Sequence, residues 1–78
     1  MSDLEIRVKE LIFKSLKVKD ISCVRNERTL TELGADSLDA VELIMAVEQE
    51  FGIKVDGDNF EHLTTVQSII DFVGGKND

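Results

Sequence analysis

The chain has 78 residues, one cysteine and one histidine, so neither an internal disulfide nor a zinc site of Cys and His ligands can hold its core together. Its net charge is −7, and residues 29–78 carry eleven acids against two bases, whereas residues 1–28 carry seven bases against five acids. Such a surface repels nucleic acid and anionic lipid, and it either attracts basic protein surfaces or serves solubility alone.

The N-terminal segment has the spacing of an amphipathic helix. Ser2 and Glu5 form a capping-box pattern at its start. The apolar residues that follow recur on one helical face: Leu4, Val8, Leu11 and Ile12. This pattern predicts a helix over residues 3–16.

Residues 17–35 have mixed polarity and no steady period, and a glycine lies near their end. We expect a long connection here, with a short turn at Thr29-x-x-Glu32, which is a second capping-box pattern. A loop of this length in so small a domain is often functional.

The next segment predicts a helix over residues 37–51 that stops at Gly52. At about 100° per residue, its apolar side chains fall on two nearly opposite faces. One is a core face: Ala40, Leu43, Ile44, Val47 and Phe51. The other consists of Leu38, Val41 and Met45, with Glu42 and Glu48 on either side. Either this helix is buried all round, or the second face is exposed and binds a partner; we favour the second, because flanking carboxylates are expensive to bury.

The C-terminal third predicts two more helices. Asp56-Gly57-Asp58 opens a short, weakly helical turn that extends to about His62. Thr64-x-x-Gln67 caps the last helix, and Gly74-Gly75 end it. A strand has little support beyond residues 53–55. We expect a single all-α domain over residues 1–78: a small four-helix bundle with three longer helices, one short helix and a long loop between helices one and two.

Ser37 lies between the carboxylates of Asp36 and Asp39 at the N-terminus of the second predicted helix. Asp36 or Ser37 can cap this helix, and the pattern does not distinguish them. Nearby negative charge disfavours an alkoxide, and no histidine lies close in sequence to act as a base, so Ser37 is a poor nucleophile. The free amides and the positive dipole end of a helix do suit an anionic ester on that hydroxyl.

The segment Gly34-Ala-Asp-Ser-Leu-Asp-Ala-Val-Glu-Leu-Ile-Met45 closely resembles the phosphopantetheine attachment segment of acyl carrier proteins of dissociated (type II) fatty-acid synthesis, bacterial or organellar. Further segments fall in the register of this family: Glu5-Ile-Arg-Val-Lys9, Val47-Glu-x-Glu-Phe51, Leu63-Thr-Thr-Val-Gln67 and Ile70-Asp-Phe72. The resemblance therefore covers nearly the whole chain.

The resemblance implies a carrier and not an enzyme. In this reading Ser37 bears 4'-phosphopantetheine, which a phosphopantetheinyl transferase installs from coenzyme A, and the thiol of that group carries growing acyl chains as thioesters. Partners are fatty-acid synthesis enzymes and acyltransferases with basic docking patches. The family positions that meet these partners are the acids Asp36, Asp39, Glu42 and Glu48 and the apolar residues Leu38, Val41 and Met45.

The resemblance also implies that short acyl chains enter the bundle, where Ile44, Val47, Leu63 and Ile69 are the candidate lining residues. Phe60 either narrows that space or completes the core. We expect a monomer in the cytoplasm of a bacterium, with a mature organellar form as the alternative. The apolar runs fall far short of a bilayer span and no signal-peptide pattern is present, so we expect no stable membrane insertion.

Three other interpretations compete with this one. A specialised polyketide or peptide carrier shares the attachment motif, although such carriers often have a less acidic second helix. A calcium-binding module would explain the acids, but Asp56-Gly-Asp58 lacks the alternating oxygen ligands of an EF-hand loop. A plain adaptor bundle predicts no modification at Ser37. We predict no metal site.

Overall fold

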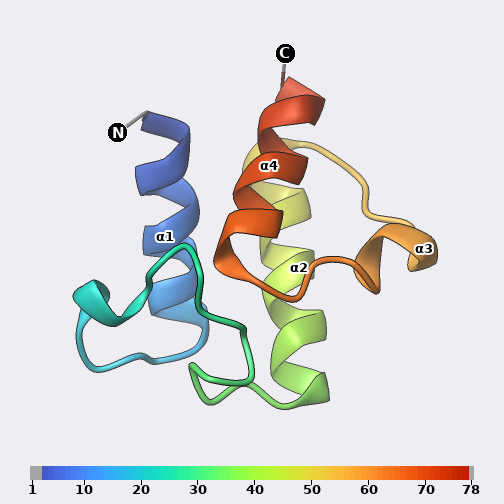
Figure 1. Ribbon diagram of the computed structural model, residues 1–78. Coiled ribbons are helices and arrows are strands. Elements are labelled where there is room, and N and C mark those ends of the chain that lie inside the picture. Colours follow the sequence, from blue (N-terminus) through green and yellow to red (C-terminus); the bar gives the residue numbers. More distant parts are fainter. Residues whose placement is uncertain (1–2, 78) are drawn as a thin grey trace.

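The computed structural model describes residues 3–77 and consists of helices joined by loops (Figure 1). In chain order the elements are α1 (Asp3–Ser15), the 3-10 turn η1 (Ile21–Cys23), α2 (Ser37–Phe51), α3 (Gly57–Phe60) and α4 (Val66–Asn77). No strand occurs in residues 3–77, where residues 29 and 65 form an isolated antiparallel bridge. The expected all-α fold, with three longer helices, one short helix and a long first loop, is confirmed.

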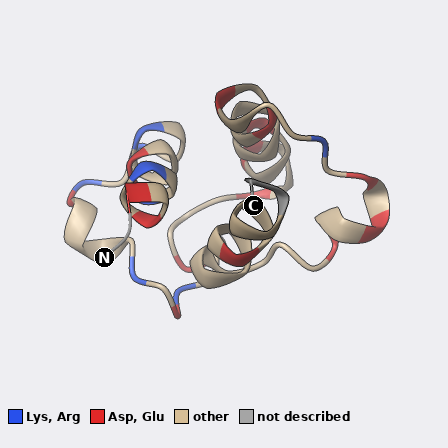
Figure 2. Ribbon diagram, turned by 90° about the horizontal axis from the view of Figure 1, so that it is seen from above, with Lys and Arg blue, Asp and Glu red and all other residues tan. Residues whose placement is uncertain are grey.

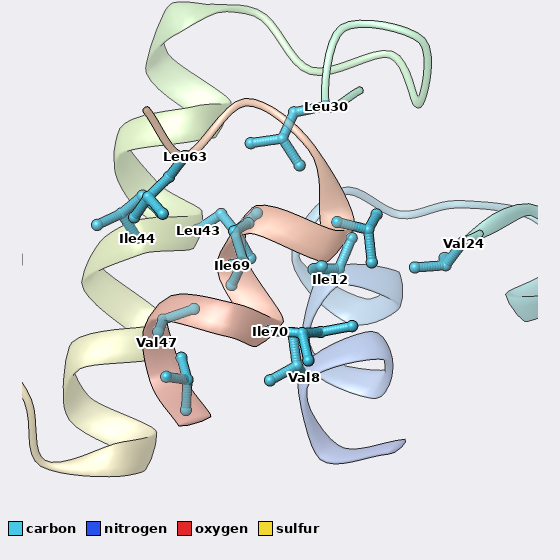
Figure 3. Packing of buried hydrophobic residues seen from close by; sticks show 12 residues of the cluster. Val8, Ile12, Val24, Leu30, Leu43, Ile44, Val47, Leu63, Ile69 and Ile70 are labelled. Atoms are coloured by element: carbon cyan, nitrogen blue, oxygen red, sulfur yellow. The ribbon is translucent and has the colours of Figure 1, made fainter. Parts of the chain in front are cut away.

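The apolar core lies where α1, α2 and α4 face one another, and α1 packs against both other helices (Figure 3). On α2 the buried residues are Leu43, Ile44 and Val47, as the helical spacing predicted, with Ala40 and Phe51 partly buried beside them. The rest of the core consists of Val8, Ile12, Val24, Leu30, Leu63, Val66, Ile69, Ile70 and Val73. Because each fully buried aliphatic side chain contributes about 1.5–3 kcal/mol, this cluster takes the place of a disulfide or a metal. No helix in the described part of the chain combines the length and the apolarity that crossing a membrane requires.

The start of α4 corrects one prediction. The cap is Thr65 and not Thr64: the hydroxyl of Thr65 accepts from the Ser68 amide, and the hydroxyl of Ser68 accepts from the Thr65 amide, both at 3.0 Å. The carbonyl of Thr64 instead accepts from the amide of Leu30 at 2.9 Å. Pairing with the first loop therefore decides which of two adjacent threonines begins the helix.

The end of α4 corrects a second prediction from the sequence. Gly74-Gly75 do not end the helix, which continues to Asn77. A β-carbon added at Gly74 would lie 3.4 Å from Cδ2 of Leu4. This distance is an ordinary van der Waals contact, so the helix passes α1 at Gly74 without a packing requirement for glycine there. The capping box predicted from Ser2 lies outside the described residues.

Hydrogen bonds hold the long loop between α1 and α2 in place over much of its length. The turn predicted at Thr29 and Glu32 is confirmed, since the side chain of each residue accepts from the amide of the other at 3.1 Å and 2.9 Å. Carbonyls of the loop also accept from the first amides of α4: Val66 donates to Arg28 at 3.0 Å, and Gln67 donates to Asn26 at 2.9 Å. The loop therefore serves as part of the cap of α4, which the sequence pattern did not show.

The side chain of Asn26 joins the loop to two helices. Its amide donates to the carboxylate of Glu5 on α1 at 2.7 Å and to the side-chain oxygen of Gln67 on α4 at 2.6 Å. The bond from Asn26, with Lys9 as a smaller contribution, holds the pKa of Glu5 below its ordinary value. A carboxyl group with a lowered pKa stabilises the fold above its ordinary pKa, and that contribution is lost as the pH falls through the lowered value.

We therefore expect Asn26→Ala to lower the urea midpoint of unfolding most strongly near neutral pH. The difference from the wild type should shrink as the pH falls below the ordinary glutamate pKa of about 4.3, because protonated Glu5 no longer attracts the amide as a charged acceptor. Urea titrations across this pH range measure the effect. In a Glu5→Gln background the cost of Asn26→Ala should not vary with pH, and a cost that varies there would assign the pH dependence to another group.

Candidate functional site

The N-terminus of α2 is closed by a reciprocal cap. Oδ1 of Asp36 accepts from the amide of Asp39 at 2.8 Å, and Oδ2 of Asp39 accepts from the amide of Asp36 at 3.3 Å. Gly34, at a φ of 92°, supplies the left-handed residue in the turn before the helix. The sequence left Asp36 and Ser37 as alternative caps; the structure shows that Asp36 is the N-cap.

Ser37 therefore has no role in capping α2. It is the first residue of α2 and is exposed. In the described structure its hydroxyl has no hydrogen-bond partner, and the amides of Ser37 and Leu38 have none either. No base contacts the hydroxyl in this part of the chain, so the arrangement cannot activate it as a nucleophile. Two free amides at the positive end of a helix favour an anion such as a phosphodiester on Ser37.

The second face of α2 is exposed. We call Leu38, Val41 and Met45 the α2 stripe; they are 65%, 41% and 54% exposed. These values exclude a helix that is buried all round and leave the alternative in which the stripe is free to bind a partner. Figure 2 shows acidic segments on α2 and α3, while most basic segments lie on α1 and the loop after it. The apolar stripe thus lies on the acidic side of the molecule.

The four acids beside the stripe differ in their surroundings. Asp36 and Asp39 form the cap of α2. Glu48 is half-buried, and its Oε2 accepts from the amide of Val55 at 2.8 Å, so it holds the connection between α2 and α3. Glu42 is exposed and makes no hydrogen bond or ion pair through its side chain in the described structure. The sequence did not distinguish these roles, since all four residues look alike as acids on one helix.

Two apolar hollows lie beside α2, and Phe60 lines both of them. The first has a volume of about 390 Å³ and is lined by Thr29, Leu30, Thr31, Ala40, Phe60, Glu61, Leu63 and Thr64. The second has a volume of about 280 Å³ and is lined by Val41, Ile44, Met45, Glu48, Val55, Asp56, Gly57 and Phe60. We call the first the near hollow and the second the far hollow, after the order along α2 of Ala40 in the first and of Val41, Ile44, Met45 and Glu48 in the second.

The candidate lining residues differ in their position relative to these hollows. Leu63 lines the near hollow and Ile44 lines the far one. Val47 and Ile69 line neither, because both side chains are fully enclosed in the core, each 0% exposed. Among residues 3–77 no group of three or more His, Cys, Asp or Glu side chains is placed to hold a metal ion.

Comparison with known proteins agrees with the geometry. The profile of a phosphopantetheine attachment site matches residues 7–73, a range that contains Ser37. Curated relatives include the acyl carrier proteins of Buchnera aphidicola subsp. Acyrthosiphon pisum strains 5A, Tuc7 and APS. Each is 44% identical over 77 residues, which cover 99% of this chain and 96% of the relative. The chain therefore belongs to the acyl carrier protein family and is a carrier with 4'-phosphopantetheine as its prosthetic group, not an enzyme.

Proposed function

We propose that Ser37 is the attachment point of 4'-phosphopantetheine and that the protein presents acyl chains to the enzymes of dissociated fatty-acid synthesis. The observation that carries this proposal is the exposed Ser37 hydroxyl, which has no structural role, beside two free amides at the start of α2. When attached, the prosthetic group supplies a thiol on a long arm, to which acyl chains are joined as thioesters.

The surroundings of Ser37 support a division of labour. No base of this chain contacts its hydroxyl among the described residues, so a phosphopantetheinyl transferase must remove the proton as the serine oxygen bonds to phosphorus and the nucleotide part of coenzyme A departs. The free amides of Ser37 and Leu38 then face the phosphodiester, whose negative charge the helix end favours. This chain holds the product of the transfer and leaves the catalysis to its partner.

The α2 stripe and its acids are the proposed docking surface for that transferase and for the synthesis enzymes and acyltransferases. An exposed apolar stripe supplies contact area, and the carboxylates steer and orient a basic partner. Asp36, Asp39 and Glu48 contribute negative charge from positions fixed by hydrogen bonds, whereas Glu42 is free to reach a partner's cation.

We further propose that the protein works as a monomer in the bacterial cytoplasm. A net charge of −7 makes copies of the chain repel one another. The free, exposed Cys23 fits a reducing compartment, and the relatives named above come from a bacterium.

Reconstitution tests this function. We expect the modified protein to support chain elongation by a purified dissociated fatty-acid synthase system from which its own carrier has been left out, and the unmodified protein to support none. Formation of long-chain acyl thioesters, read by mass spectrometry, is the measurement. A modified protein that accepts an acyl group but supports no elongation would contradict the assignment to fatty-acid synthesis and favour a specialised carrier.

A further inference from the structure

A third apolar hollow lies between α1 and the loop that follows it. It has a volume of about 430 Å³, and its apolar lining comes from Ile6 on α1 and from Ile21 and Val24 in the loop. We call it the α1 hollow. It shares no lining residue with the α2 stripe or with the near and far hollows. In Figure 1 the loop of residues 17–28 runs beside α1 at one end of the molecule, whereas α3 lies at the other end.

The apolar side chains at the rim of this hollow are exposed. Ile6 is 40% and Ile21 is 45% exposed, while Val24 at 2% belongs to the core beneath them. In the part of the chain that the structure describes, the exposed large hydrophobic side chains are these two and the three of the α2 stripe. Exposed apolar residues that gather at one hollow, instead of lying scattered singly, indicate a contact surface. The α1 hollow is therefore a second candidate for docking.

The charge around the α1 hollow is opposite to that around the α2 stripe. Residues 14–28 carry five bases against two acids, a net of +3 in a chain of net charge −7. One of the two acids, Asp20, is engaged by the backbone, since its carboxylate accepts from the amide of Ser22 at 2.9 Å. Three of the five bases form no ion pair in the described structure, namely Lys14, Lys17 and Lys19. This segment attracts acidic groups and repels basic ones.

Two basic side chains line the hollow itself, and they differ in how far their charge is already used. Lys9 is 13% exposed, and its Nζ lies 3.7 Å from Oε1 of Glu5, so its charge has a partner within the fold. Nε of Arg25 lies 3.0 Å from Oε1 of Glu27, but the two terminal nitrogens of Arg25 have no partner in the described structure. Arg25 is 62% exposed. Its terminal nitrogens can therefore bind a carboxylate in the bidentate geometry that guanidinium groups favour.

We propose that the α1 hollow is a second docking surface, for a protein segment whose apolar side chains are flanked by carboxylates. The apolar side chains of that segment cover Ile6 and Ile21, and one of its carboxylates pairs with Arg25. Lys19, two residues before Ile21, adds to the attraction. The inference goes beyond the proposed carrier function and does not depend on attachment at Ser37.

The opposite charges of the two surfaces make them select different partners. A partner with a basic patch is attracted to the α2 stripe and repelled by residues 14–28, and an acidic partner is affected in the opposite way. Because the two surfaces have no residue in common, both can be occupied at once. A second copy of the chain and an anionic lipid surface are less suitable occupants of the α1 hollow, since the net charge of −7 repels both.

The test uses two synthetic peptides of about 18 residues, long enough to form an amphipathic helix. The first has leucines on one face and glutamates along both edges of that face; the second has lysine in place of each glutamate. Each is added to the full, isotopically labelled chain at low salt, and backbone amide signals are followed. The glutamate peptide should shift the signals of Ile6, Ile21 and Arg25, and the lysine peptide should instead shift those of the α2 stripe.

Two variants test the contacts. Arg25→Glu should weaken binding of the glutamate peptide by roughly three- to tenfold, and Ile21→Ala should weaken it through lost apolar contact. Both side chains are exposed, so neither change should unfold the chain. Lys54→Glu is the matched control, because it changes the net charge as much as Arg25→Glu does, but Lys54 is an exposed residue between α2 and α3. It should leave the binding close to that of the wild type.

Several results would overturn the proposal. These are the absence of shifts at the α1 hollow with the glutamate peptide, shifts there with the lysine peptide, and equal weakening by Lys54→Glu and Arg25→Glu. Shifts at the hollow on concentrating the carrier alone would assign it to a second copy, and shifts with vesicles of anionic lipid would assign it to a membrane surface. Failure of Ser37 to gain the prosthetic group would contradict the proposed function and leave this inference standing.

Discussion

In the variant Ser37→Ala, incubation with coenzyme A, Mg²⁺ and a broad-specificity phosphopantetheinyl transferase is expected to leave the mass of the protein unchanged. The wild type should gain one 4'-phosphopantetheine group under the same conditions. The loss should be complete, because the phosphodiester needs the oxygen that the substitution removes. Intact-mass spectrometry measures both outcomes directly.

The structure indicates that Ser37→Ala removes the attachment point without disturbing the fold. Asp36 caps α2, so Ser37→Ala removes an exposed hydroxyl without a partner in the described structure and should change the free energy of unfolding by less than about 0.5 kcal/mol. Loss of the cap in Asp36→Ala should cost about 1 kcal/mol. Ser22→Ala removes another exposed serine and should still be modified in full. A mass gain in Ser37→Ala, or its loss in Ser22→Ala, would place the attachment elsewhere.

The bounds of α2 could be predicted from the sequence because both of its ends are determined locally. At the N-terminus the cap joins residues only three apart. At the C-terminus Gly52 adopts a left-handed φ of 65°, which glycine enters without strain. The two faces of the helix follow from spacing alone, so the core residues and the exposed stripe could be assigned before any tertiary contact was known.

The ends of α4 could not be predicted in the same way, because contacts with other parts of the chain influence them. Thr64 and Thr65 are equally good caps by type, and the amide of Leu30 engages the first of them. Gly74 and Gly75 stay within the helix despite the low helix propensity of glycine. The end of α1 was predicted to within one residue, at residue 16 against Ser15, although Lys17 takes a left-handed φ of 52° just after it and no glycine signals the turn.

The features of the candidate site also fall into two groups, those that depend on one helix and those that depend on several elements. Ser37 and the stripe are features of one helix and could be found from its periodicity and its motif. The hollows depend on how α2, α3 and the first loop meet, and this arrangement leaves Val47 and Ile69 enclosed in the core and outside both hollows.

The last prediction concerns the α2 stripe and its charge. In the variant Glu42→Lys we expect association with a partner that has a basic docking patch to slow by about three- to tenfold at low salt. Glu42 is the acid beside the stripe that forms no hydrogen bond or ion pair in the described structure, so reversing its charge should alter steering without loosening the fold. Stopped-flow association with the modified protein, at low and at high salt, measures the effect, and the variant's rate should depend less on salt than the wild type's.

Glu10→Lys separates local steering from net charge. It changes the total charge by the same amount, but Glu10 is an exposed acid on α1, away from the stripe. If the stripe is the docking surface, Glu10→Lys should slow association much less than Glu42→Lys, because a charge acts most strongly within about a Debye length of the contact. Equal slowing by both variants would mean that the overall negative charge attracts the partner and that the acids of α2 have no special part in docking. Unchanged rates in both would leave solubility as the role of this acidic face.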